Sequence, residues 1–154
     1  MKLILFISSI FLLLGLTVYF YYSKHKPMEP SKIIYTDKAP KPIGPYSQAV
    51  LRGNALFVSG QVAFIPGTDK IDTSTIENET KQVMENIKTI VEEAGMKMSD
   101  IAKTSIFLID MNNFGKVNQV YGTYFPTNPP ARETVQVSAL PKKVNLEISV
   151  IAIK

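Results

Sequence analysis

The chain has 154 residues and a formal net charge of +4, with 17 Lys and Arg against 13 Asp and Glu, which suits one modest domain plus an extension. It contains no Cys, and this excludes disulfides, thiolate catalysis, lipid attachment through Cys and zinc sites built from Cys. Its single His, His25, lies near the amino terminus, so the rest of the chain cannot form a Ser-His-Asp triad or a His cage for a metal.

An uncharged run rich in Leu, Ile and Phe extends from Leu3 to Tyr22. Its length is about that of a helix that crosses a bilayer core, roughly 20 residues. The run ends in bulky aromatic residues and lacks the small residues of a cleavage site. Residues 1–22 are therefore predicted to be an uncleaved hydrophobic anchor, with a cleaved signal sequence as the alternative. Lysines after the run favour a cytoplasmic domain; cleavage would mean export.

Residues 23–32 are predicted to be a linker, because Pro27 and Pro30 oppose a continuing helix. The remaining domain, residues 33–154, holds 13 basic and 12 acidic side chains. The basic character therefore belongs mostly to the amino-terminal flank. This favours a membrane surface as a partner and argues against a nucleic acid, which would need Lys and Arg concentrated on the domain.

The first half of the domain is predicted to contain three strands and a helix. Strands are expected at residues 33–36, 48–52 and 55–62, with Arg52-Gly53-Asn54 as the hairpin between the last two. Ser74-x-x-Glu77 has the pattern of a capping box, and apolar residues at helical spacing run from there to Ala94. Gly95 is expected to end this helix.

The second half of the domain is predicted to contain a strand, a helix and two further strands. A β-branched strand is expected at residues 101–109, and Asn112 or Asn113 can cap a second helix that ends before Pro126. Two final strands are expected at residues 133–139 and 144–153. The order β-β-β-α-β-α-β-β predicts an α+β fold with both helices on one face of a sheet. The other face needs a cover, and a homo-oligomer is the simplest one.

The last two strands contain the residues of greatest chemical interest. Arg132 is one of only two Arg in a chain with 15 Lys, and its planar fork can bind a carboxylate with two parallel hydrogen bonds. If the Val residues of its strand face the helices, Arg132, Thr134 and Glu147 all point to the opposite face. Arg132 and Glu147 are then neighbours, either as an interface salt bridge or as a carboxylate clamp beside a group that handles water or protons.

Three further positions are candidates, each with a purely structural alternative. Tyr46 lies on a tight Gly-Pro turn, where it could instead pack under a loop. Gly60, next to Ser59, lies inside a strand, where it could admit a ligand or form a β-bulge. Asn118 lies on the apolar flank of the second helix, where it needs a partner that a nearby loop could supply.

Six motifs, in order and in register, resemble the RidA (YjgF-type) family across residues 33–154. They are Ile43-Gly44-Pro45-Tyr46-Ser47-Gln48-Ala49, Val58-Ser59-Gly60-Gln61, Asn86-Ile87 with Glu92-x-Ala94-Gly95, Val117-Asn118-x-x-Tyr121, Pro130-Ala131-Arg132, and Leu140-Pro141-Lys142 with Glu147-Ile148. The resemblance does not include the predicted anchor.

The resemblance implies a chorismate-mutase-like α+β fold, assembled as a homotrimer with active sites between subunits. It implies hydrolysis of reactive enamines and imines, such as 2-aminoacrylate and 2-iminobutanoate, to 2-keto acids and ammonium, with no cofactor and no metal. Carried over by position, Arg132 binds the substrate carboxylate and Glu147 orients the attacking water. Tyr46, Ser59, Gly60, Asn118 and Thr134 line the cleft.

One position departs from the family pattern. The residue two after the Arg is often Cys in the deaminating subgroup, and here it is Thr134, which keeps a hydrogen-bonding group but not a thiol. The family also has members without demonstrated deaminase action. The alternative function is therefore a non-catalytic module that binds small carboxylates in the same cleft. Nucleic-acid cleavage is disfavoured by the nearly neutral domain.

Overall fold

The computed structural model describes residues 14–21 and 30–154 of the chain. One six-stranded sheet has the strand order β1-β2-β3-β6-β4-β5. The strands are β1 (Lys32–Ile34), β2 (Ala49–Arg52), β3 (Ala55–Gln61), β4 (Ile101–Leu108), β5 (Ala131–Gln136) and β6 (Leu146–Ile153), and the helices that pack on the sheet are α2 (Ile76–Glu93) and α3 (Phe114–Thr123). The predicted order of strands and helices and the predicted α+β class are confirmed.

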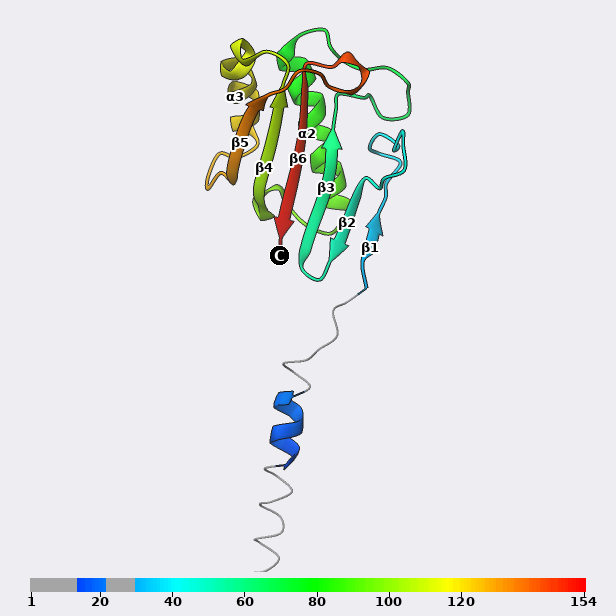
Figure 1. The fold of residues 1–154 in the computed structure, drawn as a ribbon, viewed down its shortest axis with the longest axis vertical. Coiled ribbons are helices and arrows are strands. Elements are labelled where there is room, and N and C mark those ends of the chain that lie inside the picture. Colours follow the sequence, from blue (N-terminus) through cyan, green and yellow to red (C-terminus); the bar gives the residue numbers. More distant parts are fainter. Residues whose placement is uncertain (1–13, 22–29) are drawn as a thin grey trace, which may run out of the picture.

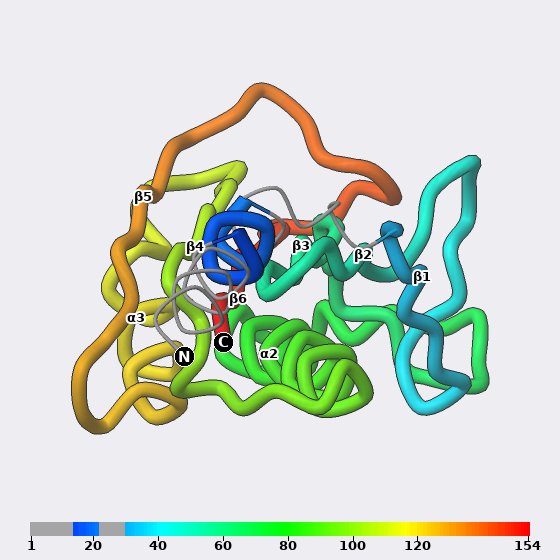
Figure 2. Tube along the Cα trace, turned by 90° about the horizontal axis from the view of Figure 1, so that it is seen from below, coloured from blue at the N-terminus to red at the C-terminus, as the bar shows by residue number. Residues whose placement is uncertain are grey.

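All strand pairs are antiparallel except β4 and β5, which are parallel. A parallel pair cannot be joined by a hairpin and needs a crossover, which α3 provides. Both α2 and α3 lie on the same face of the sheet, as Figures 1 and 2 show from two directions. In the described part of the chain, neither α2 nor α3 covers the opposite face, which is called the open face below.

The core lies between the sheet and α2. Alternate residues of β3, β4 and β6 point to the helices, as the period of two predicts. Its fully buried large apolar side chains include Leu56, Val83, Met84, Ile87, Ile90, Ile106, Leu108, Leu146 and Ile148. The open face instead carries apolar side chains that are about half exposed: Phe57 is 48% exposed, Val135 41% and Ile153 50%.

The helix termini differ in detail from the prediction. The N-cap of α2 is Thr75, whose Oγ1 accepts a hydrogen bond from the backbone N–H of Asn78 at 3.1 Å. Ser74 instead donates its hydroxyl to Asp72, so the expected capping box beginning at Ser74 is wrong by one residue. Gly95 follows α2 with φ +73°, a left-handed conformation that suits Gly, and so confirms the predicted stop.

The described residues contain no helix that is long and apolar enough to cross a membrane. Residues 14–21 are helical, and a helix of that length spans about 12 Å, against a hydrocarbon core of about 30 Å. The predicted location, in which an N-terminal helix anchors the domain to a membrane, is therefore wrong. Residues 1–13 and 22–29, which include the rest of the predicted anchor and most of the linker, lie outside the described residues. The predicted domain boundaries stay predictions.

A buried carboxylate fixes the start of β6. Glu79 of α2 is 0% exposed, and its Oε1 accepts the backbone N–H of Asn145 at 2.7 Å, while its Oε2 accepts the side-chain amide of Asn145 at 2.7 Å. The N–H of Leu146 also points to Oε1, at 3.4 Å. Because Leu146 precedes Glu147, this contact between α2 and β6 also sets where Glu147 lies.

Replacing Glu79 by Leu is expected to lower the free energy of unfolding by about 3 kcal/mol, because it removes the acceptor of three N–H donors, the two backbone N–H groups and the side-chain amide of Asn145. Denaturant unfolding of the purified protein measures this change. Glu92→Leu, at an exposed position of the same helix, is the control and should change stability by less than about 0.5 kcal/mol. Equal stability of the two variants would contradict the assigned role of Glu79.

Candidate functional site

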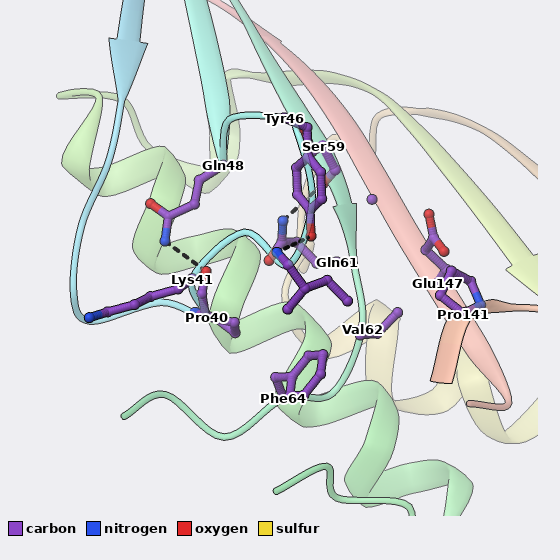
Figure 3. Close-up of a pocket in the computed structure, with 12 residues that line it drawn as sticks. Pro40, Lys41, Tyr46, Gln48, Ser59, Gln61, Val62, Phe64, Pro141 and Glu147 are labelled. Carbon is purple, nitrogen blue, oxygen red and sulfur yellow. Dashed lines mark hydrogen bonds between the residues drawn. The ribbon is translucent and has the colours of Figure 1, made fainter. Parts of the chain in front are cut away.

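A cleft of about 260 Å³ opens where β3 and β6 meet the loops at one end of the sheet. It contains Tyr46, Ser59, Gly60 and Glu147, four of the seven residues expected at the site. Figure 3 shows the side chains of Tyr46, Ser59 and Glu147 around this cleft. The complete lining is Pro40, Lys41, Ile43, Tyr46, Gln48, Ser59, Gly60, Gln61, Val62, Phe64, Pro141 and Glu147.

A buried amide holds the loop that forms one wall of this cleft. Gln48 is 1% exposed, and its Nε2 donates to the carbonyls of Thr36 at 3.0 Å and Pro40 at 2.8 Å. Its Oε1 accepts the backbone N–H of Thr36 at 2.8 Å. The Tyr46 hydroxyl accepts the N–H of Ile43 at 3.1 Å, so the ring closes the same loop on itself. Tyr46 still has 46% of its surface exposed, at the mouth of the cleft.

Ser59 and Gly60 lie where the pairing of β3 with β6 is irregular. The register shifts between Val58 and Gln61, as expected of a β-bulge. Ser59 donates its hydroxyl to the carbonyl of Ser47 at 2.7 Å and its backbone N–H to the carbonyl of Gln48 at 3.0 Å. The hydroxyl oxygen of Ser59 therefore remains able to accept a hydrogen bond from a ligand.

The side chain of Glu147 lies against the backbone of Gly60, so any larger residue at position 60 would displace the Glu147 carboxylate. A Cβ at Gly60 would lie 2.7 Å from Cδ of Glu147 and closer still to Oε1. The sequence predicted that Gly60 admits a ligand or forms a bulge. The structure has the bulge, and the group that approaches the Gly backbone is the carboxylate of Glu147.

Within residues 14–21 and 30–154, no cation forms an ion pair with the carboxylate of Glu147. Burial raises the pKa of Glu147 above that of an ordinary Glu, because the neutral form is favoured away from water. Raised carboxyl pKa values in clefts are typical of groups that transfer protons.

The raised pKa predicts how stability depends on pH. A carboxyl group with a higher pKa in the folded state binds its proton more tightly there, so its stabilising contribution is complete below the unfolded pKa, about 4.3. That contribution is lost as the pH rises through the folded pKa. The melting temperature of the wild type, measured relative to Glu147→Gln, is expected to rise when the pH falls from 7 to about 4. A constant difference over this range would contradict the raised pKa.

The other three predicted residues, Arg132, Asn118 and Thr134, do not line this cleft and lie on β5 and α3. In β5, Arg132 pairs with Thr104 of β4 and points to α3, where its Nη1 donates to Oδ1 of Asn118 at 2.8 Å. The guanidinium carbon lies 4.9 Å from the ring centroid of Tyr121 and 5.7 Å from that of Phe114. A second cavity, of about 470 Å³, is lined by Asn118, Tyr121, Gly122, Phe125, Pro129, Pro130 and Arg132.

Thr134 lies two residues after Arg132 and on the same side of β5, paired with Ile106. In the described part of the chain, its Oγ1 is the one buried side-chain N or O atom without a hydrogen-bond partner. A buried hydroxyl without a partner is costly in a folded protein unless water or a ligand satisfies it. Thr134 therefore offers a free hydroxyl to a water molecule or a ligand.

The predicted meeting of Arg132 and Glu147 on one face does not occur within one chain. β4 lies between β5 and β6, and Phe107 pairs with both Glu147 and Val135, which places Glu147 level with Val135. Residues two strands and three positions apart have Cα atoms roughly 14 Å apart. Glu147 points to the open face, whereas Arg132 and Thr134 point to α3, so the predicted facing of β5 is wrong.

The cause of this error lies in the edge position of β5. Its Val135 lies on the open face and is 41% exposed, whereas a polar amide and two aromatic rings of α3 surround Arg132. The assumption that Val faces the helices holds for central strands over an aliphatic core. It fails where the helix presents polar and aromatic groups to the edge strand.

Sequence reasoning missed two residues that support the candidate site. Glu79 falls on the apolar stripe of α2, three residues after Ile76 and four before Val83, so a buried acid was visible there as an anomaly. Tyr121 was assigned to the core, yet Phe114, Asn118 and Tyr121 follow one another at helical spacing and form the surface on which Arg132 rests. No group of three or more His, Cys, Asp or Glu among the described residues is placed to hold a metal.

Comparisons with known proteins agree on one family. The family described as Endoribonuclease L-PSP matches residues 36–154. A RutC family protein of Pyrococcus horikoshii is 50% identical over 123 residues, covering 80% of this chain and 98% of that protein. A protein of Rattus norvegicus named 2-iminobutanoate/2-iminopropanoate deaminase is 43% identical over 123 residues, covering 80% of this chain and 90% of that protein.

Solved structures have the same fold. The structure of E. coli TdcF with bound serine is 41% identical, has a TM-score of 0.77, and the match covers 80% of this chain and 98% of that one. The YjgF gene product of E. coli gives the same identity, TM-score and coverage. The chain therefore belongs to the family described as Endoribonuclease L-PSP, the RidA (YjgF) family that its sequence motifs resemble.

Proposed function

We propose that this protein hydrolyses reactive imines and enamines of amino acids, such as 2-iminobutanoate and 2-aminoacrylate, to 2-keto acids and ammonium. The enamine takes up a proton at carbon to give the imine. The oxygen of water then bonds to the imine carbon while a proton of the water passes to the nitrogen, which gives a carbinolamine. The hydroxyl of this intermediate loses its proton as the C=O bond forms and the carbon–nitrogen bond breaks, so the nitrogen leaves as ammonia and takes up that proton to become ammonium. Membership of the family and the names of relatives such as the Rattus norvegicus deaminase support this proposal.

The observation that carries the proposal is Glu147. Its carboxylate lies in an open cleft, forms no ion pair with a described cation, and has a pKa raised by burial. Such a group can accept a proton from the attacking water and return it to the leaving nitrogen, since its pKa lies closer to neutrality than that of an ordinary Glu. Ser59, Gly60 and Tyr46 form the wall beside it.

Arg132 supplies the charge that the substrate requires. Its guanidinium uses one N–H group on Asn118 and pairs with no described acidic side chain. The remaining N–H groups can bind the carboxylate of an imino acid in the bidentate manner. Asn118 fixes the guanidinium, and the unpaired hydroxyl of Thr134 is available to the substrate two residues further along the strand.

Because Arg132 and Glu147 point to opposite faces of one sheet, the proposed site takes its two halves from different subunits. We place it between the subunits of a homotrimer, with edge strand β5 of one subunit beside the Glu147 cleft of the next. The exposed apolar residues of the open face support such an assembly, because a large uncovered apolar surface is typical of an interface. These residues are Ile33, Phe57, Val135 and Ile153.

The function is tested by adding the purified full-length protein to 2-iminobutanoate generated in situ from threonine by a dehydratase. With a nucleophilic trap that competes for the imine, the protein is expected to lower the yield of trapped imine and raise that of 2-oxobutanoate. Saturable binding of 2-oxobutanoate with no acceleration of imine loss would contradict the proposal and favour the non-catalytic carboxylate-binding module.

A further inference from the structure

Tyr121 combines three contacts that fix its ring under Arg132. It is 5% exposed, and its hydroxyl donates to Oγ1 of Thr104 at 3.1 Å. Its ring packs against that of Phe125, with centroids 4.8 Å apart. The guanidinium carbon of Arg132 lies 4.9 Å from the same ring. The ring is therefore immobilised by Thr104 and Phe125, and it presents a fixed π-surface to the cation.

Arg132 needs such support because it lies on an edge strand. Its side chain has many rotamers, and its only hydrogen bond to a described residue is the single one to Asn118. One bond fixes a point and leaves the guanidinium free to turn about it. A ring within about 6 Å of a guanidinium restricts the plane as well as the position, through cation–π attraction.

We propose that Tyr121 is a positioning residue that orients the guanidinium of Arg132 for bidentate binding of the substrate carboxylate. Tyr121 acts through Arg132, because its ring faces the guanidinium and its hydroxyl is bonded to Thr104. The ring of Phe114 lies farther from the same guanidinium, at 5.7 Å, and is 39% exposed, so its cation–π attraction to Arg132 is weaker. The inference rests on the proposed function insofar as it takes an imino acid as the carboxylate that Arg132 binds.

Two quantities test the inference: KM for 2-iminobutanoate, and the dissociation constant of 2-oxobutanoate measured by titration without turnover. Tyr121→Leu is expected to raise both about 10-fold while kcat stays within about 3-fold, because the loss concerns binding that ground and transition states share. Tyr121→Phe keeps the ring and should stay within about 2-fold. Phe114→Leu, at an exposed position that does not threaten folding, should raise both constants about 2-fold.

A structural role is separated from a positioning role by a matched control and a double-mutant cycle. Val117→Ala removes core contacts from the same helix at a residue that is 1% exposed, and it should lower the melting temperature without changing either constant. In the Arg132→Lys background, Tyr121→Leu should add less than about 2-fold, since its effect passes through the guanidinium. Equal fold-changes in both backgrounds would overturn the inference.

The kinetic measurement and the binding measurement together also distinguish the role of Tyr121 from the proposed function. If the wild type binds 2-oxobutanoate in a Tyr121-dependent manner but hydrolyses no imine, the function fails and the positioning role stands. If the wild type hydrolyses the imine and folded Tyr121→Leu and Phe114→Leu keep its KM, the positioning role fails and the function stands. A wild type that binds no carboxylate overturns both.

Discussion

Glu147→Gln is expected to lower kcat for 2-iminobutanoate hydrolysis by about 10²- to 10⁴-fold, the range typical of a lost general acid–base group. Gln keeps the shape that fits against Gly60, but its amide can neither take a proton from water nor return one to the leaving nitrogen. Steady-state kinetics of imine loss measure the effect. KM should change little, because in the proposal Arg132 holds the substrate carboxylate.

The control for this variant is Glu93→Gln, which removes an exposed carboxylate at the end of α2 and should leave kcat unchanged. Activity of Glu147→Gln within a few-fold of the wild type would remove Glu147 from the mechanism. The cleft around it would then be a binding site only.

Arg132→Lys is expected to lower kcat/KM by about 10²-fold, mainly through a higher KM. Lys keeps the charge but loses the planar fork, the bond to Asn118 and the contact with the Tyr121 ring. The chain offers a matched control in Arg52→Lys, the same change at the exposed end of β2. The kinetics of this control should equal those of the wild type, and a similar loss in both variants would show that the effect is not specific to Arg132.

The sequence predicted the fold more completely than the site, for a physical reason. Local patterns define the β2–β3 hairpin at Gly53 and the end of α2 at Gly95, and both are present. The facing of β5 depends instead on what α3 presents to it, which is a tertiary property. The contact of Glu79 with the start of β6 joins residues 66 positions apart, so the helical pattern could reveal a buried acid but not its partner.

The seven predicted site residues show the same difference between what local sequence patterns reveal and what depends on tertiary structure. The motif positions assign all seven residues to one cleft, but they could not say that one chain holds them in two separate groups. Tyr46, Ser59, Gly60 and Glu147 share one cleft, whereas Asn118, Arg132 and Thr134 gather on α3 and β5. The strand order, with β4 between β5 and β6, separates them.

Mixing two variants with low kcat/KM tests the central claim, that one active site takes Glu147 and Arg132 from different subunits, when activity is measured at substrate concentrations well below KM. Arg132→Lys and Glu147→Gln are unfolded together and refolded at equal concentrations, with each variant refolded alone as the control. The mixture is expected to recover about a quarter of the wild-type activity, because random assembly leaves about one site in four with both halves intact. A mixture no more active than the two variants alone, with mixed oligomers verified by mass, would contradict the account.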